Sequence, residues 1–81
     1  MFDANDIRLD NWEDIKVVKK KPIEIHAVQM NLPEGFFVDT LEGKMTGQPG
    51  DWLMFGVNGE KYPCKSEIFD KSYDIVRDKG V

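Results

Sequence analysis

The chain has 81 residues, a net charge of −4, and 41% hydrophobic against 32% charged residues, which is typical of one small globular domain and excludes a disordered chain. No apolar run approaches the ~20 residues that cross a bilayer, and the acidic start of the chain is unlike a signal peptide. One cysteine and one histidine are too few for a zinc site built from these ligands. We therefore expect a cytoplasmic protein without a membrane span, metal or cofactor.

The negative charge is concentrated at the N-terminus. Residues 1–14 carry five acids against Arg8 alone, whereas residues 15–81 carry ten acids and ten bases. We therefore divide the chain into an acidic N-terminal arm, residues 1–14, and a single small β-rich domain, residues 15–81. A nucleic-acid binder normally has a basic surplus. Although residues 19–21 are three consecutive lysines, we expect no direct contact with nucleic acid.

The arm contains a pattern typical of the start of a helix. Asp10 and Glu13 have the spacing of a capping box, which predicts a short helical turn before Ile15. Such a turn would place Leu9, Trp12 and Ile15 on one side. Two interpretations of the arm follow: it packs on the body through Trp12, or it stays disordered until a partner binds.

From Ile15 the sequence has the pattern of strands. Residues 23–27 alternate between apolar and polar side chains, and Val28 and Met30 then reverse the phase. The reversal predicts either a bulge near Ala27 or a strand that is covered on both faces.

Turn residues mark the connections that follow. Leu41-Glu42-Gly43 is a tight connection that predicts a hairpin of residues 36–40 and 44–48. Pro49-Gly50 fits the centre of a type II turn, because proline presets the first φ and glycine accepts the positive φ of the second position. Asp51 follows at a position from which its side chain can accept hydrogen bonds from turn amides.

Asn58-Gly59 predicts a second hairpin, since both residues tolerate the positive φ of a type I′ turn. A two-residue loop would pair Phe55 with Tyr62. The side chains that would then share one face are Leu53, Phe55, Val57, Tyr62 and Cys64. The turns would set the register that buries this face, so we interpret the Pro49-Gly50-Asp51 turn as a structural staple in preference to a contact site.

The C-terminal part predicts one short helix and a last strand. Ser66 is expected to cap the helix SEIFDKSY, in which Phe69 and Tyr73 are neighbours, and residues 73–76 have a strand pattern. The expected fold is α+β and mainly β: five or six short strands in a small antiparallel sheet or partly open barrel, with one short helix near the C-terminus.

The segment PGDWLMFGVNGEKYPCKSEIFDKSYD resembles a motif of small phage and prophage proteins. Its general form is PGD(W or Y), then GE-x-YP, then IF-x-x-(S or T)-Y-(D or E). KKKPIEIHAVQM and the TLEG at residues 40–43 resemble the strand and hairpin that precede the motif, so the resemblance covers residues 19–76. Family members have a longer segment after the first strand, where this chain has only NLPEG, and the acidic arm is an addition. The resemblance implies a phage origin and a small β-rich domain, and implies no biochemical activity.

Candidate catalytic groups are few. Cys64 and His26 are the one conceivable nucleophile and base, with Asp39 or Asp51 to orient the imidazole. The sequence has neither a nucleophile elbow nor a glycine-rich oxyanion loop, and a cysteine in a hairpin is more often a small core residue. The acids that follow strands or turns lack the convergent spacing of a cation site. We therefore predict no catalytic or metal-binding residues and no enzyme activity.

Aromatic residues suggest binding instead. Trp52 and Met54 would lie on the face opposite Phe55, where they are either covered by the helix or the arm, or form a docking patch. The residues that we predict to bind a partner are Asp3, Asp6, Asp10, Trp12, Glu13, Asp14, Trp52 and Met54.

The function that we expect is that of a phage-encoded protein-binding module in the host cytoplasm. Its partner would be a host or phage protein, and it would inhibit or modulate a host enzyme or defence complex. An alternative is an oligomeric accessory or structural protein of phage assembly, with Trp52 and Met54 at the subunit interface. A Cys64-dependent enzyme is a third hypothesis.

Overall fold

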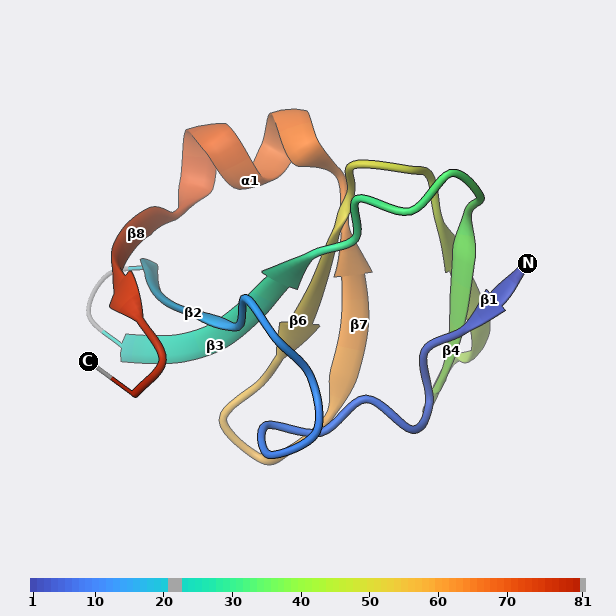
Figure 1. Ribbon diagram of the computed structural model, residues 1–81, viewed down its shortest axis with the longest axis horizontal. Coiled ribbons are helices and arrows are strands. Elements are labelled where there is room, and N and C mark those ends of the chain that lie inside the picture. The colour runs from blue at the N-terminus through green and yellow to red at the C-terminus, as the bar shows by residue number, and fades with distance from the viewer. Residues whose placement is uncertain (21–22, 81) are drawn as a thin grey trace.

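A computed structural model describes residues 1–20 and 23–80 of the chain. These residues contain eight strands and one helix (Figure 1). In chain order they are β1 (Phe2–Asp3), β2 (Lys16–Lys20), β3 (Ile23–Gln29), β4 (Phe36–Thr40), β5 (Gly43–Gly47), β6 (Trp52–Phe55), β7 (Lys61–Cys64), α1 (Ser66–Ser72) and β8 (Asp74–Asp78). The predicted fold class, α+β and mainly β with one short helix near the C-terminus, is confirmed. Lys21, the last of the three consecutive lysines, lies outside the described residues.

The strands belong to two open sheets and do not close into a barrel. The larger sheet is antiparallel and has the order β7-β6-β3-β2-β8, and the smaller has the order β1-β4-β5. The predicted hairpin of β4 and β5 is confirmed, with Thr40 opposite Gly43. β1 pairs with β4 in parallel, which the sequence did not predict. The strand count exceeds five or six partly because the N-terminal residues contribute this strand.

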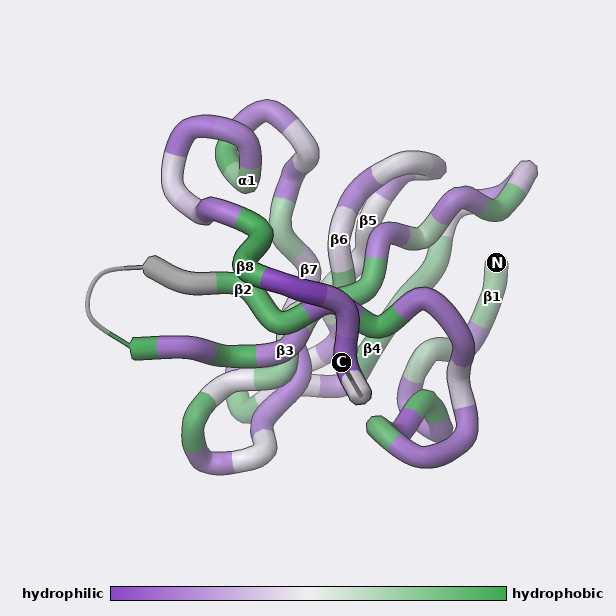
Figure 2. The backbone as a smooth tube through the Cα atoms, turned by 60° about the vertical axis from the view of Figure 1, so that its left-hand side comes forward, coloured by the Kyte–Doolittle hydropathy of each residue, from purple (hydrophilic) through white to green (hydrophobic). Residues whose placement is uncertain are grey.

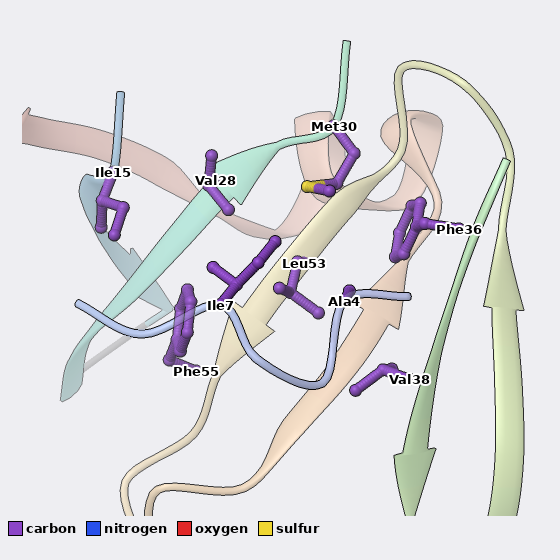
Figure 3. Packing of buried hydrophobic residues seen from close by; sticks show 9 residues of the cluster. All are labelled: Ala4, Ile7, Ile15, Val28, Met30, Phe36, Val38, Leu53 and Phe55. Carbon is purple, nitrogen blue, oxygen red and sulfur yellow. The ribbon is translucent and has the colours of Figure 1, made fainter. Parts of the chain in front are cut away.

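Both faces of the larger sheet carry buried residues. One face packs against the smaller sheet and the N-terminal arm, and Figure 3 shows the nine buried residues of this first cluster: Ala4, Ile7, Ile15, Val28, Met30, Phe36, Val38, Leu53 and Phe55. The other face packs against α1 in a second cluster: Val18, Ala27, Trp52, Met54 and Phe69. The molecule thus has three layers, with the larger sheet in the middle.

The phase reversal in β3 reflects this double burial. Ala27 belongs to the second cluster and Val28 to the first. β3 pairs without interruption with both of its neighbours, so the interpretation of a strand covered on both faces is confirmed and the bulge near Ala27 is wrong. The register instead shifts between Val17 and Val18, where β2 pairs with β8.

Asp51 connects the turn before β6 to the helix. Gly50 has φ 90° and the Asp51 N–H donates to the Gln48 carbonyl at 3.0 Å, as the predicted type II turn requires. The Asp51 side chain is buried, and its two carboxylate oxygens accept hydrogen bonds from the main-chain N–H groups of Gln48 and Ser66, each at 3.0 Å. The prediction that Asp51 binds turn amides is confirmed.

The helix cap differs from the prediction. Lys65 holds the N-cap position and makes no capping bond through its side chain, and Ser66 is already the first helical residue. The predicted cap by Ser66 is wrong because the carboxylate of Asp51 supplies the acceptor for its N–H. This carboxylate also places negative charge at the positive end of the helix dipole.

Trp52 extends the contact between turn and helix. Its ring stacks on Phe69 with centroids 3.8 Å apart and an interplanar angle of 6°, and Phe69 stacks on Tyr73 at 5.3 Å. The predicted contact between Phe69 and Tyr73 is confirmed. Of the two interpretations of the Trp52 and Met54 face, cover by the helix is the one observed.

The hairpin of β6 and β7 is shifted by one residue from the predicted register. Tyr62 pairs with Met54 and not with Phe55. Because side chains alternate between faces, the shift places Tyr62 and Cys64 on the face of Trp52, whereas Phe55 remains on the opposite face. The prediction that these residues share one face is therefore wrong.

The loop of this hairpin explains the shift. The Gly56 N–H donates to the Glu60 carbonyl at 2.8 Å, and the Gly59 N–H donates to the Gly56 carbonyl at 3.0 Å. Gly59 has φ 82°, whereas Asn58 is not among the residues with positive φ. The loop therefore has three residues and a glycine bulge, the next most common hairpin connection after the two-residue type I′ turn. Val57 is left exposed in the loop.

We predict that Asp51→Ala lowers the free energy of unfolding by about 2 kcal/mol, because two amides lose their acceptor and the helix loses its cap. Asp51→Asn should cost about 1 kcal/mol, since its single carbonyl oxygen replaces one of the two acceptors. Urea denaturation followed by circular dichroism measures both. The matched control is Asp10→Ala, an exposed carboxylate, with a change within about 0.5 kcal/mol. Equal stability of all three variants would contradict the role of Asp51.

Candidate protein-binding surface

The N-terminal arm is anchored in the hydrophobic core. Ala4 and Ile7 are buried among side chains of β3, β4 and β6 (Figure 3), and the Ala4 N–H donates to the Phe37 carbonyl at 2.8 Å. Phe2 and Trp12 contact each other edge to face, with centroids 5.5 Å apart. Of the two interpretations of the arm, packing on the body is the one observed. The contact includes Trp12, as predicted, and also residues that the sequence did not single out.

The middle of the arm is folded by Asn11 and not by a capping box. The Asn11 side chain accepts a hydrogen bond from the Arg8 N–H at 2.7 Å and donates one to the Asp6 carbonyl at 2.8 Å. Residues 9–11 form a turn and residues 13–14 a bend, with no helix in between, so the predicted helical turn is wrong. Asn11 satisfies the local main-chain groups in a non-helical conformation, which is the usual competition between such side chains and a helix.

All five acids of the arm are exposed: Asp3, Asp6, Asp10, Glu13 and Asp14. Along the arm, hydrophilic stretches alternate with short hydrophobic ones (Figure 2). Arg8 approaches Asp10 at 3.5 Å, and both side chains are largely in solvent, where such a pair contributes little. The buried residues thus hold the arm in place while its carboxylates face outward.

The arm and the core border a groove of about 650 Å³, which includes four of the residues predicted to bind a partner: Trp12, Glu13, Asp14 and Trp52. Lys16 also lines this groove. Its ammonium donates to the Asp78 carboxylate at 2.6 Å, and this hydrogen bond raises the pKa of Lys16. Asp14 also attracts this cation. The charged residues that line the groove are Glu13, Asp14 and Lys16, so its lining has a net negative charge.

The other predicted residues fall in two places. Asp3, Asp6 and Asp10 lie on the arm and do not line the groove. Met54 is fully buried and Trp52 is 5% exposed beneath α1. These two side chains therefore lack the exposed area that a docking surface needs, and Trp52 contributes only an edge to the groove.

Cys64 and His26 do not form a catalytic pair. Cys64 pairs with Trp52 and belongs to the face that α1 covers, whereas His26 pairs with Phe55 on the opposite face. The sheet therefore separates the thiol from the imidazole. Among residues 1–20 and 23–80, no group of three or more His, Cys, Asp or Glu side chains is placed to hold a metal ion.

Sequence reasoning missed a second groove, of about 520 Å³, beside the tip of the β4–β5 hairpin. Leu41, Met45 and Tyr62 are among its lining residues. Burial raises the pKa of Tyr62, and a hydrogen bond with the Tyr73 side chain raises it further, so its hydroxyl stays protonated. The signal in the sequence was Leu41, a large apolar residue at the tip of a predicted turn.

We predict that Ile7→Ala lowers the free energy of unfolding by about 3 kcal/mol, because it leaves a cavity in the first cluster. The neighbouring residue supplies the control, since Asp6→Ala changes an exposed side chain and should stay within about 0.5 kcal/mol. Chemical denaturation measures both. If the two variants were equally stable, the arm would not be part of the core.

We predict that the two tryptophans differ in accessibility. In the Trp12→Phe variant, Trp52 alone should emit at shorter wavelength and be quenched less by acrylamide than Trp12 in the Trp52→Phe variant, because α1 covers Trp52. Circular dichroism checks that both variants are folded. Equal quenching of the two would show that α1 does not cover Trp52 in solution.

Comparisons of the chain with protein-family models, with curated proteins and with solved structures find no match. The resemblance to small phage proteins therefore stays a prediction from the motif. In the described ranges, no helix is long and apolar enough to span a membrane.

Proposed function

We propose that this protein is a phage-encoded binding module that contacts and modulates a host enzyme or defence complex in the host cytoplasm. The phage origin and the host target come from the sequence resemblance. The acidic arm is the contact surface. The observation that carries this proposal is the anchoring of the arm by Ala4 and Ile7 while all five of its carboxylates remain exposed.

An anchored arm favours binding for an entropic reason. A segment that is already ordered loses less conformational freedom on association than a disordered one, so more of the interaction energy becomes affinity. The partner surface is basic, because it has to complement Glu13, Asp14 and the acids of the outer turns. Complementary charge of this kind mainly raises the association rate and selects the partner.

The positions of Cys64 and His26 also support a binding role. The two side chains project from opposite faces of the sheet. They are therefore not placed to act together as the nucleophile and base that the sequence offers. The acids of the arm are more consistent with electrostatic recognition than with acid–base chemistry, since they are solvated and spread along the surface.

An oligomeric accessory or structural protein of phage assembly is the second candidate. The observation that favours it is β8, an edge strand on which Ile75 and Val76 are about half exposed. The face of Trp52 and Met54 is buried, so it does not provide the subunit interface of such an oligomer. Light scattering separates the two proposals: a defined multimer favours the second, and a strict monomer removes it.

The proposed function is tested by affinity capture from host lysate with charge variants of the full chain. Deleting the arm would remove core residues, so we neutralise it instead with Asp6→Asn, Asp10→Asn and Glu13→Gln together. The matched control removes the same charge elsewhere, with Glu67→Gln, Asp70→Asn and Asp74→Asn, all exposed side chains. We expect the arm variant to lose the partner that the wild type and the control retain.

Salt provides a second readout of the same experiment. Capture by the wild type should weaken as ionic strength rises beyond about 0.15 M, where the Debye length falls below ~8 Å. Identical capture by both variants would move the contact to the β-rich body. No capture by the wild type at micromolar concentration would count against the proposed function.

A further inference from the structure

The second groove lies between the tip of the β4–β5 hairpin and the beginning of β7, and Leu41, Met45 and Tyr62 contribute apolar surface to it. Leu41 is fully exposed and Met45 is 37% exposed. A large apolar side chain that is completely solvated at a hairpin tip contributes nothing to the core. Apolar residues beside a concavity are typical of a binding site, and methionine adapts its shape to different apolar partners.

Acidic side chains surround this apolar surface. Asp39, Glu42 and Glu60 line the groove against one cation, Lys61. The Lys61 ammonium is already engaged by the main-chain carbonyl of Asn5, at 2.8 Å. In the part of the chain that the structure describes, none of the three carboxylates makes an ion pair. The groove therefore has a surplus of negative charge.

Lys44 does not remove this surplus. It lies opposite Asp39 in the register of β4 and β5, but its ammonium sits over the Phe37 ring, 4.4 Å from the centroid. A cation–π contact of this kind competes with pairing to the carboxylate. Asp39 instead accepts a hydrogen bond from the Asn5 side chain at 3.0 Å.

Asn5 joins the groove to the acidic arm. Its side-chain amide nitrogen donates to Asp3 at 2.7 Å and to Asp39 at 3.0 Å, and its amide oxygen accepts the Asp39 N–H at 2.7 Å. These bonds hold a carboxylate of the arm and a carboxylate of the groove close to the same side chain. The acidic surface of the arm thus continues into the groove.

We infer that this groove binds a basic peptide segment of the partner protein, which places one apolar side chain between Leu41 and Met45 and its flanking Lys or Arg residues against the surrounding carboxylates. The inference rests on the proposed function and names the chemistry of the partner. Apolar contact supplies affinity, and charge complementarity supplies selection against acidic segments.

The test is a titration of the isotope-labelled full chain with three synthetic peptides, followed by NMR chemical shifts. The probe KRLFKR combines an apolar pair with flanking cations, KRSGKR lacks the apolar pair, and EELFEE reverses the charge. We expect KRLFKR to shift the amides of residues 40–45 and 60–62, with at least roughly tenfold higher affinity than KRSGKR. EELFEE should leave these residues unshifted.

Substitutions test whether the peptide binds at this groove. Leu41→Ser should weaken KRLFKR about tenfold, since the anchor loses its apolar contact, and it leaves the fold intact because Leu41 packs on nothing. Glu42→Lys should weaken binding further and reduce its salt dependence. The matched control is Val57→Ser, another exposed apolar residue, in the other hairpin loop, which should bind like the wild type.

Three outcomes would overturn the inference: no shift at the groove, equal affinity of KRSGKR, or binding of EELFEE. Shifts confined to Asp6, Asp10 and Glu13 would also overturn it, yet leave the proposed function of the arm standing. The proposed function would be contradicted by a different result, namely equal capture from lysate by the arm variant and its charge-matched control.

Discussion

The fold depends on one buried carboxylate. Asp51 accepts the N–H groups of Gln48 and Ser66, and so ties the turn that starts β6 to the first residue of α1. Trp52, the next residue, stacks on Phe69 of the same helix. A seven-residue helix is too short to be stable alone in water, so these two contacts hold α1 on the sheet. Without that cover, one face of the sheet would be exposed.

The opposite face of the larger sheet needs a second cover, and the acidic arm provides part of it. A chain of this length buries a smaller fraction of its surface than a larger protein, so segments outside the main sheet have to contribute core residues. Ala4 and Ile7 do so, while the acids between and beyond them face solvent. One segment therefore stabilises the fold and presents charge, because successive residues point in different directions.

The same arrangement unites the segments that the sequence groups as one motif. Asp51 and Trp52 from PGDW, Tyr62 from GEKYP, and Phe69 and Tyr73 from IFDKSY meet around α1 and the face it covers. The motif residues are therefore spaced along the chain so that they meet in one packed contact. The exposed acids of the arm and Leu41 at the hairpin tip lie outside this contact.

The sequence alone is sufficient to predict the features that depend on neighbouring residues: the mainly β class, the Pro49-Gly50 turn, the hairpin at Gly43, and the contact of Phe69 with Tyr73. It also showed that β3 has apolar residues in both phases. The register of β6 and β7 depends on packing in the folded protein, because Asn58-Gly59 is compatible with two loop lengths and the pairing of Tyr62 with Met54 beside α1 selects one of them. The cap of α1 and the burial of the arm depend on the folded protein in the same way. Those outcomes depend on side chains far apart in the chain, such as Asp51 and Ser66, which local patterns do not bring together.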